Sequence, residues 1–377
     1  MDRISDLYRR FDQKNNMVCR PHWDSSLDHL TAQRHEAQFR NMKGGLIGFG
    51  LQDYALAASS GLLANSLGTH VNEPNSGLTS WEELPIPGIF KFPEEKQDIV
   101  EETDITNRTK RVARYLGADL VGIAKLDMRW VYSHHYIPKT GESKQVEIDS
   151  RYKNVIIMAI EMDYDMQKLA PSALLMAEVQ RSYSRMAYLV GSLAQFIRQL
   201  GYSAIPSIND TALNVPIAID AGLGQLSRLG LLITPQFGPR QRLCKVITDL
   251  PLAADEPVDF GVTEFCSVCK KCARECPAQA VFQGELTAEV SSISNNPGVM
   301  KWPLSAEKCR EYWGKVGTVC GVCVRVCPFN KGGRRIHNLS RWLINHMPSI
   351  NPVMVRLDDL LGYGKYHEPK RFWNNRV

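Results

Sequence analysis

The sequence predicts an α+β fold in which one sheet packs against helices and a cysteine-rich module follows. Strand-like apolar runs alternate with helix-like segments between residues 105 and 250. Such alternation is typical of a sheet that helices cover. Eight of the ten cysteines then lie between Cys266 and Cys327. The length of 377 residues is enough for two or three domains.

The elements of the central region follow one another with clear boundaries. Residues 106–116 have apolar side chains at helical spacing, and the apolar runs 119–126 and 153–162 are typical of buried strands. Pro171 precedes a long helical segment that Gly201 ends. A short strand after residue 202, a helix over about 211–221 and strands within 230–238 and 244–252 complete the region.

The chain divides into four predicted domains or layers. Residues 1–100, with glycine-rich patches and a proline-rich stretch over 82–93, are expected to cover a cofactor as an N-terminal layer. The sheet domain then spans 101–258, the cysteine module with an insertion spans 259–335, and a C-terminal extension spans 336–377. The net charge of +5 is spread without a long basic run, so nucleic acid is not expected as a partner.

The cysteine spacing predicts two [4Fe–4S] clusters. The first run reads C-x2-C-x2-C-x3-C-P, and the second keeps only the last three cysteines, with the missing one displaced upstream. In such runs the fourth cysteine ligates the neighbouring cluster. The first set of ligands is therefore predicted to be Cys266, Cys269, Cys272 and Cys327. The second set is predicted to be Cys276, Cys309, Cys320 and Cys323.

Zinc sites and disulfides explain these runs less well. Zinc needs only two C-x2-C pairs and does not favour Cys-Pro ends. Disulfides would not account for two matched runs. The two remaining cysteines, Cys19 and Cys244, are expected to be buried free thiols.

The segment from Ile105 to Lys331 resembles the corrinoid- and iron–sulfur-dependent reductive dehalogenases, most nearly the tetrachloroethene type. The similarity is carried, in order, by GADLVGIAKL, WVYS, YSRM, QFIR, AIPS, AGLGQLSRLG, ITPQFGP, DFGVTEFC, CKKCARECP and CGVCVRVCPFNKG. The displaced Cys309 also resembles the shortened second motif of that family. The resemblance implies a nitroreductase-like, corrinoid-binding sandwich with a C-terminal two-cluster ferredoxin-like module. It also implies a base-off corrinoid, which fits the absence of D-x-H-x-x-G from this sequence.

The resemblance also implies roles for individual residues. Tyr183 corresponds to the proton donor of the family, Arg242 to its companion arginine and Asn209 to a nearby asparagine. A phenol is protonated at neutral pH, and a guanidinium stabilises the phenolate that remains after proton transfer. The expected cofactor contacts are Trp313, Arg228 and Trp302. From the residue pattern alone, a tyrosine on the apolar stripe of a helix is more often a core residue, and a lone arginine more often forms a surface ion pair.

The function that the resemblance implies is reductive dehalogenation, in which hydrogen replaces the halogen of a small organohalide. Electrons would pass from an external low-potential donor through both clusters to cobalt. A small membrane-anchor protein and a second copy in a homodimer are further expected partners. Two alternatives stay open: an enzyme like epoxyqueuosine reductase that modifies tRNA, and a non-catalytic iron–sulfur/corrinoid electron-transfer protein.

The location of the chain also stays open. The sequence shows no export signal and no apolar run of about twenty residues. A mature exported form on the outer face of a membrane and a cytoplasmic enzyme both fit this observation. The sequence does not predict the organohalide or which cluster lies nearer to cobalt.

Overall fold

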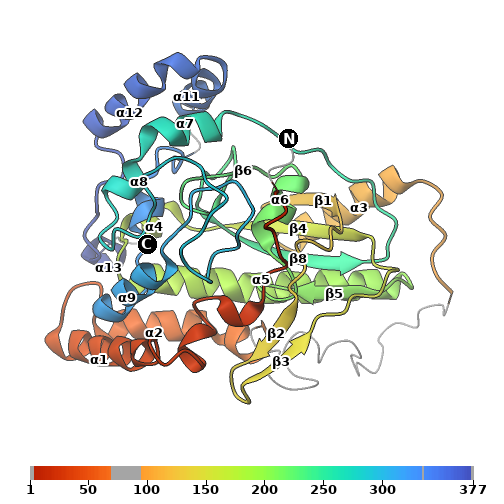
Figure 1. The fold of residues 1–377 in the computed structure, drawn as a ribbon, viewed down its shortest axis with the longest axis horizontal. Coiled ribbons are helices and arrows are strands. Elements are labelled where there is room, and N and C mark those ends of the chain that lie inside the picture. Colours follow the sequence, from red (N-terminus) through yellow and green to blue (C-terminus); the bar gives the residue numbers. More distant parts are fainter. Residues whose placement is uncertain (1–3, 69–94, 333–334, 375–377) are drawn as a thin grey trace.

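A four-stranded antiparallel sheet forms the centre of the computed structural model, which describes residues 4–68, 95–332 and 335–374. The strand order is β1-β4-β8-β5 (Figure 1). The strands are β1 (Leu120–Lys125), β4 (Asn154–Glu161), β8 (Gln241–Thr248) and β5 (Ala204–Ser207). All their pairings are antiparallel and helices cover the sheet, which confirms the predicted α+β class.

The sheet is buried on both faces, and this explains its continuous apolar runs. In β4, Ile156 and Met158 belong to the core cluster shared with α3 (Glu102–Tyr115) and α5 (Ala173–Gln199). The intervening Val155 and Ile157 belong to the cluster shared with α6 (Asn214–Asp220). Alternate strand residues point to opposite faces, so a strand between two helical layers is apolar at every position.

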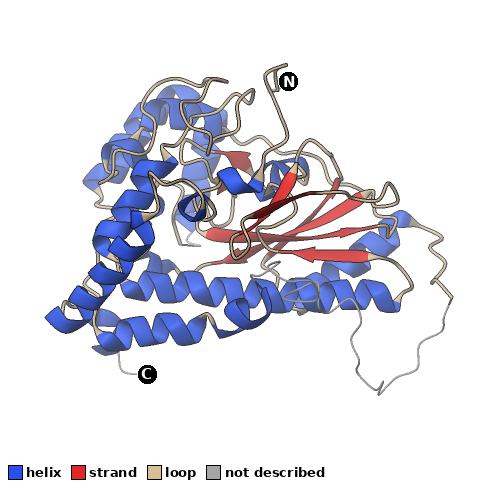
Figure 2. Ribbon diagram, turned by 60° about the horizontal axis from the view of Figure 1, so that its bottom comes forward, coloured by secondary structure: helices blue, strands red, loops and turns tan. Residues whose placement is uncertain are grey.

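Helix α5 is the longest element and runs along the sheet (Figure 2). The side chain of Ser172 caps it, because its Oγ accepts a hydrogen bond from the backbone N–H of Leu175 at 3.1 Å. One side of α5 packs on the sheet, and α2 (Leu51–Ser60) packs on another. The helix is therefore apolar on more than one face, and the predicted helical segment before Gly201 is confirmed.

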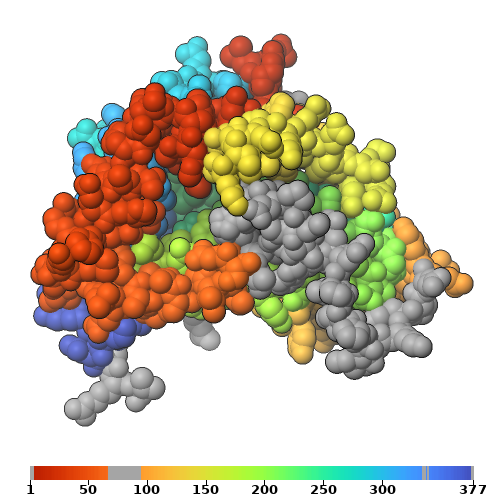
Figure 3. Space-filling view, turned by 90° about the horizontal axis from the view of Figure 1, so that it is seen from below, coloured from red at the N-terminus to blue at the C-terminus, as the bar shows by residue number. Residues whose placement is uncertain are grey.

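The N-terminal segment lies against both the sheet domain and the cysteine module. It contains η1 (Gln13–Asn15), η2 (Arg20–His22), α1 (His29–Gly44), α2 and the single-turn π-helix η3 (Ala64–Gly68). Helix α1 packs against α9 (Ala306–Val316) of the cysteine module. Figure 3 shows the molecule hollowed between these red and orange helices and the yellow hairpin of β2 and β3. The predicted proline-rich stretch over 82–93 lies outside the described residues.

The cysteine module consists of short helices. They are α7 (Val262–Cys269), α8 (Lys271–Arg274), α9 and α10 (Val322–Arg325), followed by α11 (Arg335–His346), η5 (Pro348–Ile350), α12 (Asn351–Leu360) and α13 (Lys370–Asn374). Helix α12 packs back on α7, and α8 contacts α10. Within the described ranges, no helix has the length and apolar character needed to span a membrane.

Some elements differ from the prediction. A hairpin of β2 (His134–Ile137) and β3 (Glu142–Gln145) was not predicted, and α4 (Tyr164–Lys168) precedes α5. The strand expected within 230–238 is only the two-residue β7 (Leu232–Ile233), which pairs with β6 (Gln225–Leu226) outside the main sheet. Strand β8 begins at Gln241, three residues before the predicted start. The four domain boundaries stay predictions.

Candidate redox and proton-transfer site

The structure brings the first set of thiols together around one cavity. The cavity is lined by Cys266, Cys269, Cys272 and Cys327. The first three come from α7 and α8, and the fourth follows α10, so two distant parts of the module contribute. Pro328 and Phe329 close another part of the wall.

The thiols of the second set also lie together. The pKa of Cys309 is raised to about 12, mainly by burial and in addition by the nearby Cys320 and Cys276 thiols. Burial likewise raises the pKa of Cys323 well above its ordinary value, with Cys320 and Cys309 among the neighbours that add to the shift. Thiols in such surroundings are protonated at neutral pH, and a metal centre would have to displace their protons.

The thiol chemistry of both sets is that of iron–sulfur cluster ligands. In the part of the chain that the structure describes, no three His, Cys, Asp or Glu side chains are close enough to hold one metal ion. Four thiols that surround a cavity instead provide soft sulfur ligands at several separate points, as iron–sulfur clusters require. The donor chemistry of the eight cysteines therefore fits two such clusters.

Arg228 and Trp302 lie beside the first set. Arg228 is 1% exposed, and its Nε donates to the backbone oxygen of Cys266 at 3.0 Å. Its Nη1 donates to the backbone oxygens of Phe282 and Gly284 at 2.9 and 2.8 Å. The guanidinium carbon lies 4.6 Å from the centre of the Trp302 ring. These two predicted cofactor contacts therefore support the wall of the first cavity.

Tyr183, Asn209 and Arg242 lie together in the structure. The Nδ2 of Asn209 donates to the hydroxyl oxygen of Tyr183 at 2.7 Å. The guanidinium carbon of Arg242 lies 5.5 Å from the centre of the Tyr183 ring. Asn209 is exposed, whereas Tyr183 and Arg242 are half-buried. The three residues predicted to act together thus come from β8, α5 and the loop after β5 and form one group.

The register of β8 explains why Arg242 reaches Tyr183. Cys244 and Val246 belong to the core cluster shared with α5, and Arg242 has the same strand parity. The opposite parity, which includes Leu243 and Ile247, faces the layer of α6. Because successive strand residues alternate, Arg242 points toward the helix that carries Tyr183.

The group has unused hydrogen-bonding capacity. The Nε of Arg242 is buried and has no hydrogen-bond partner among the described residues. Val319 packs in the same apolar cluster as Tyr183 and directly precedes Cys320 of the second set. Trp313 packs in the neighbouring cluster with Cys320. A buried donor without a partner among the described residues, beside the Tyr183 ring, fits a further bound group at this place.

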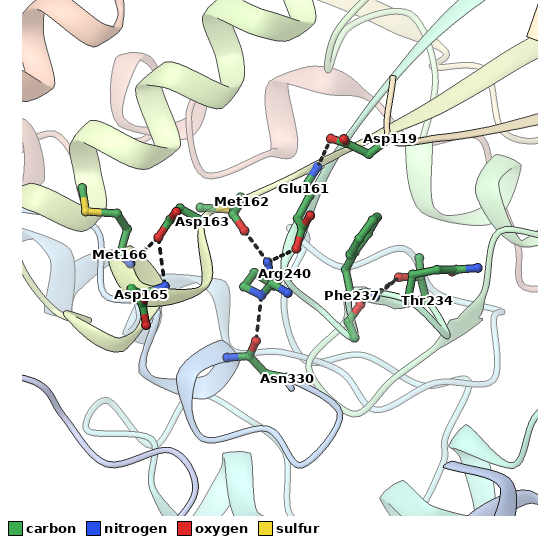
Figure 4. Close-up of polar contacts among 12 residues, drawn as sticks. Asp119, Glu161, Met162, Asp163, Asp165, Met166, Thr234, Phe237, Arg240 and Asn330 are labelled. Carbon is green, nitrogen blue, oxygen red and sulfur yellow. Dashed lines mark hydrogen bonds and ion pairs between the residues drawn. The ribbon is translucent and has the colours of Figure 1, made fainter. Parts of the chain in front are cut away.

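Arg240 joins the sheet to the cysteine module (Figure 4). This residue is 2% exposed, and its Nη1 donates to Glu161 Oε1 at 2.6 Å and to the backbone oxygen of Met162. Its Nε donates to Oδ1 of Asn330, which follows Cys327 by three residues. The start of β8, and hence Arg242, is thereby fixed relative to the segment that follows Cys327.

Two further residues adjoin the site and were not predicted. Lys245 is fully buried on β8, and its Nζ donates to Oδ1 of Asn214 at 2.7 Å. Asn214 Nδ2 in turn lies 3.3 Å from Oδ1 of Asn209. The only sequence signal was a lysine in the middle of the apolar run CKVIT, where a charge is costly unless it serves a purpose.

Comparisons with known proteins agree with this arrangement. Residues 265–330 match the family model of the 4Fe-4S double cluster binding domain. The chain is 42% identical over 315 residues to a tetrachloroethene reductive dehalogenase of Sulfurospirillum multivorans, covering 77% of this chain and 62% of that protein. It is 36% identical over 358 residues to the Dehalobacter restrictus enzyme of the same name, covering 81% and 64%.

A solved structure shares the fold. It is a reductive dehalogenase described with a mechanism for B12-dependent dehalogenation, and it matches with a TM-score of 0.75 at 25% identity. The match covers 98% of this chain and 48% of that one. The chain thus spans a little under two thirds of the length of the two curated relatives and about half of the solved one.

Proposed function

Because the chain is a homologue of the reductive dehalogenases, we propose that it is an oxidoreductase that replaces the halogen of a small organohalide by hydrogen. The observation that carries this proposal is the group of Tyr183, Asn209 and Arg242, in which Tyr183 packs with Val319, the residue directly before Cys320. The proposed cofactors are two [4Fe–4S] clusters and a base-off corrinoid. The sheet with α5 against it is the part that we propose to be nitroreductase-like.

The eight cysteines would hold the clusters, and Trp313 with the unpartnered Nε of Arg242 would contact the corrinoid. When bound, the corrinoid supplies a strongly reducing cobalt centre to the organohalide. The second set of thiols adjoins the apolar cluster of Tyr183. We therefore propose that electrons from an external donor enter through the first cluster and leave through the second.

The chain's own residues would supply the proton. The reaction consumes R–X, two electrons and one proton, and yields R–H and halide. Tyr183 would donate the proton from its hydroxyl to the carbon that loses the halogen. Arg242 would stabilise the phenolate by its charge, and the N–H of Asn209 would stabilise it by a hydrogen bond. Tyr183 packs in an apolar cluster with Leu175, Val179 and Val319, and apolar surroundings suit a substrate that offers few hydrogen bonds.

The first experiment combines cofactor content with one substitution. The protein is reconstituted without oxygen with iron, sulfide and cobalamin, and we expect about eight irons and one cobalt per chain. Tyr183→Phe should keep this content but lose halide release from chlorinated ethenes and phenols with a reduced viologen. Tyr188→Phe, on the same helix but 52% exposed, is the matched control and should keep activity.

Each contrary result has a distinct meaning. Iron without cobalt would contradict the corrinoid, and turnover by Tyr183→Phe would contradict the proton donor. Turnover of epoxyqueuosine but of no organohalide would favour the tRNA-modifying alternative. The membrane-anchor protein, the homodimer and both candidate locations stay predictions.

A further inference from the structure

A chain of hydrogen bonds runs from behind the sheet to the hydroxyl of Tyr183. Lys245 Nζ donates to Oδ1 of Asn214 at 2.7 Å, and Asn214 Nδ2 lies 3.3 Å from Oδ1 of Asn209. Asn209 Nδ2 then donates to the oxygen of Tyr183 at 2.7 Å. Lys245 has the strand parity that faces α6, so the chain starts on the opposite face of the sheet from α5.

The orientation of each amide in this chain is fixed by its neighbours. Asn214 Nδ2 also donates to the backbone oxygens of Ile208 and Leu243 at 2.7 and 3.0 Å, so its nitrogen cannot exchange places with its oxygen without losing both bonds. Its Oδ1 is left for Lys245, whose ammonium group can only donate. Because Nδ2 of Asn214 faces the side chain of Asn209, the Asn209 amide turns its oxygen toward that nitrogen.

The position of the loop is fixed as well. Tyr132 donates its hydroxyl proton to the backbone oxygen of Asn209 at 3.1 Å. Lys245 makes a second bond to the backbone oxygen of Asp210 at 2.9 Å. Ser207 Oγ also donates to that oxygen, at 2.6 Å. Together with the bond from Asn214 to the backbone oxygen of Ile208, these contacts anchor the backbone on both sides of the Asn209 side chain, and only the terminal amide would be free to turn.

From these contacts we infer that Lys245 and Asn214 are positioning residues that set which way the Tyr183 hydroxyl donates. The Asn209 amide can present only N–H to the tyrosine oxygen, so that oxygen must accept. The hydroxyl hydrogen of Tyr183 must then point away from Asn209, toward the side on which a substrate would lie. This inference deepens the proposed function and rests on it.

The inference predicts what happens when Lys245 or Asn214 is replaced and its hydrogen bonds are lost. Without Lys245, Oδ1 of Asn214 and the backbone oxygen of Asp210 both lose a donor, so the loop that carries the Asn209 amide is held less firmly. Asn209 can then present its oxygen to Tyr183, which draws the hydroxyl hydrogen away from the substrate. Substrate binding should change little, because neither Lys245 nor Asn214 is proposed to touch the substrate.

The test uses a probe of the tyrosine that does not need turnover. 3-Fluorotyrosine is placed at position 183 of the reconstituted protein, and its 19F resonance is recorded for the variants Lys245→Met and Asn214→Ala. We expect both substitutions to shift or split the resonance. With the natural tyrosine, both should lower kcat for halide release by roughly 10- to 100-fold, while KM changes by less than about 3-fold.

Lys125→Met is the control for the loss of a lysine–asparagine hydrogen bond. Lys125 is exposed on a strand that does not carry the site, and its Nζ donates to Oδ1 of Asn154 and to the backbone oxygen of Leu252, both at 2.9 Å. Its resonance and kcat should match those of the unsubstituted protein. Asn214→Ala keeps Lys245 in place, so it tests the second link even if Lys245→Met does not fold.

An unchanged resonance in both variants would overturn the inference. The same holds if Lys125→Met shifts the resonance as much as Lys245→Met does. A third outcome is that the resonance shifts in the variants while the unsubstituted protein releases no halide from any organohalide. This result would support the positioning role of Lys245 and Asn214 and contradict the proposed function.

Discussion

The charge state of Lys245 is coupled to folding. Its side chain is fully buried, and burial lowers its pKa from 10.5 to about 7. Asp210 and Cys244 oppose this shift, and His135 also senses the lysine charge. These are the titratable groups that face Lys245 from the neighbouring elements. The free-energy cost of burying this cation must be offset by the contacts that it makes with Asn214 and Asp210.

We expect the stability of the folded chain to rise with pH because of Lys245. The unfolded chain keeps this lysine protonated up to its ordinary pKa, so between pH 7 and about 10 it binds more protons than the folded chain does. The destabilisation is complete below pH 7 and is relieved as pH rises, by at most about 1.4 kcal/mol per pH unit. Urea unfolding at pH 7, 8 and 9 would measure this rise in the free energy of unfolding.

The variant Lys245→Met isolates the effect, because other groups titrate alike in both proteins. The free energy of unfolding of the unsubstituted protein, minus that of Lys245→Met, should increase between pH 7 and 9. Parallel pH curves for the two proteins would contradict the lowered pKa of Lys245.

At the scale of the element, the sequence was informative where a segment is apolar and continuous. β1, β4 and α5 were predicted because their residues are buried between layers. The hairpin of β2 and β3 was missed because all four residues of β3 are exposed, so no apolar alternation marks it. β7 is shorter than predicted because Pro235 and a tight turn follow it, with Thr234 paired to Gly238.

The candidate site was predictable only in part, and for a similar reason. Cysteine spacing is a local pattern, so the two ligand sets were visible in the sequence. The three residues Tyr183, Asn209 and Arg242 were found through resemblance to a family, because nothing local links them. Lys245 and Asn214 were missed, since their partners include backbone oxygens of Ile208 and Leu243 that no residue pattern reveals.

The turn between β7 and β8 provides an element-scale prediction. A Cβ at Gly238 would lie 2.3 Å from the backbone oxygen of Phe329, and the residue has a φ of +60°. Gly238→Ala should therefore push the turn away from the segment that follows Cys327. We expect reconstituted Gly238→Ala to lose iron faster to a chelator, with reduced stability of roughly 2 kcal/mol or more.

Gly230→Ala is the control for the backbone strain alone. Gly230 has a φ of +70°, but nothing lies within 4 Å of an added Cβ. The Gly230→Ala variant should lose only about 1–2 kcal/mol of stability and keep its iron. Equal iron loss in the two variants would show that the close approach to Phe329 does not hold the module in place.

At the scale of the whole molecule, Arg240 links the sheet domain to the cysteine module. Replacing it by methionine leaves the backbone oxygen of Met162 and Oδ1 of Asn330 without this donor. Glu161 is 40% exposed, so the lost ion pair itself costs less than a fully buried one. We expect Arg240→Met to lower the free energy of unfolding by about 2–3 kcal/mol in urea titrations.

Arg274 offers the comparison for a surface arginine. Its ion pairs with Glu275 and Asp359 involve side chains that are about half exposed, so Arg274→Met should cost less than about 1 kcal/mol. If Arg274→Met destabilised the protein as much as Arg240→Met, the burial of Arg240 would not explain its effect on stability.

The length of α5 has a consequence for how such a protein can diversify. Leu175 and Val179 pack with Val319, beside the second set of thiols, and Tyr183 follows on the same helix. Two helical turns, roughly 12 Å, separate Leu175 from Tyr183. One inserted residue between them would rotate the tyrosine by about 100° away from the strand that carries Arg242. Insertions and deletions should therefore be tolerated in the covering helices, where new substrate preferences can arise, but not within this stretch of α5.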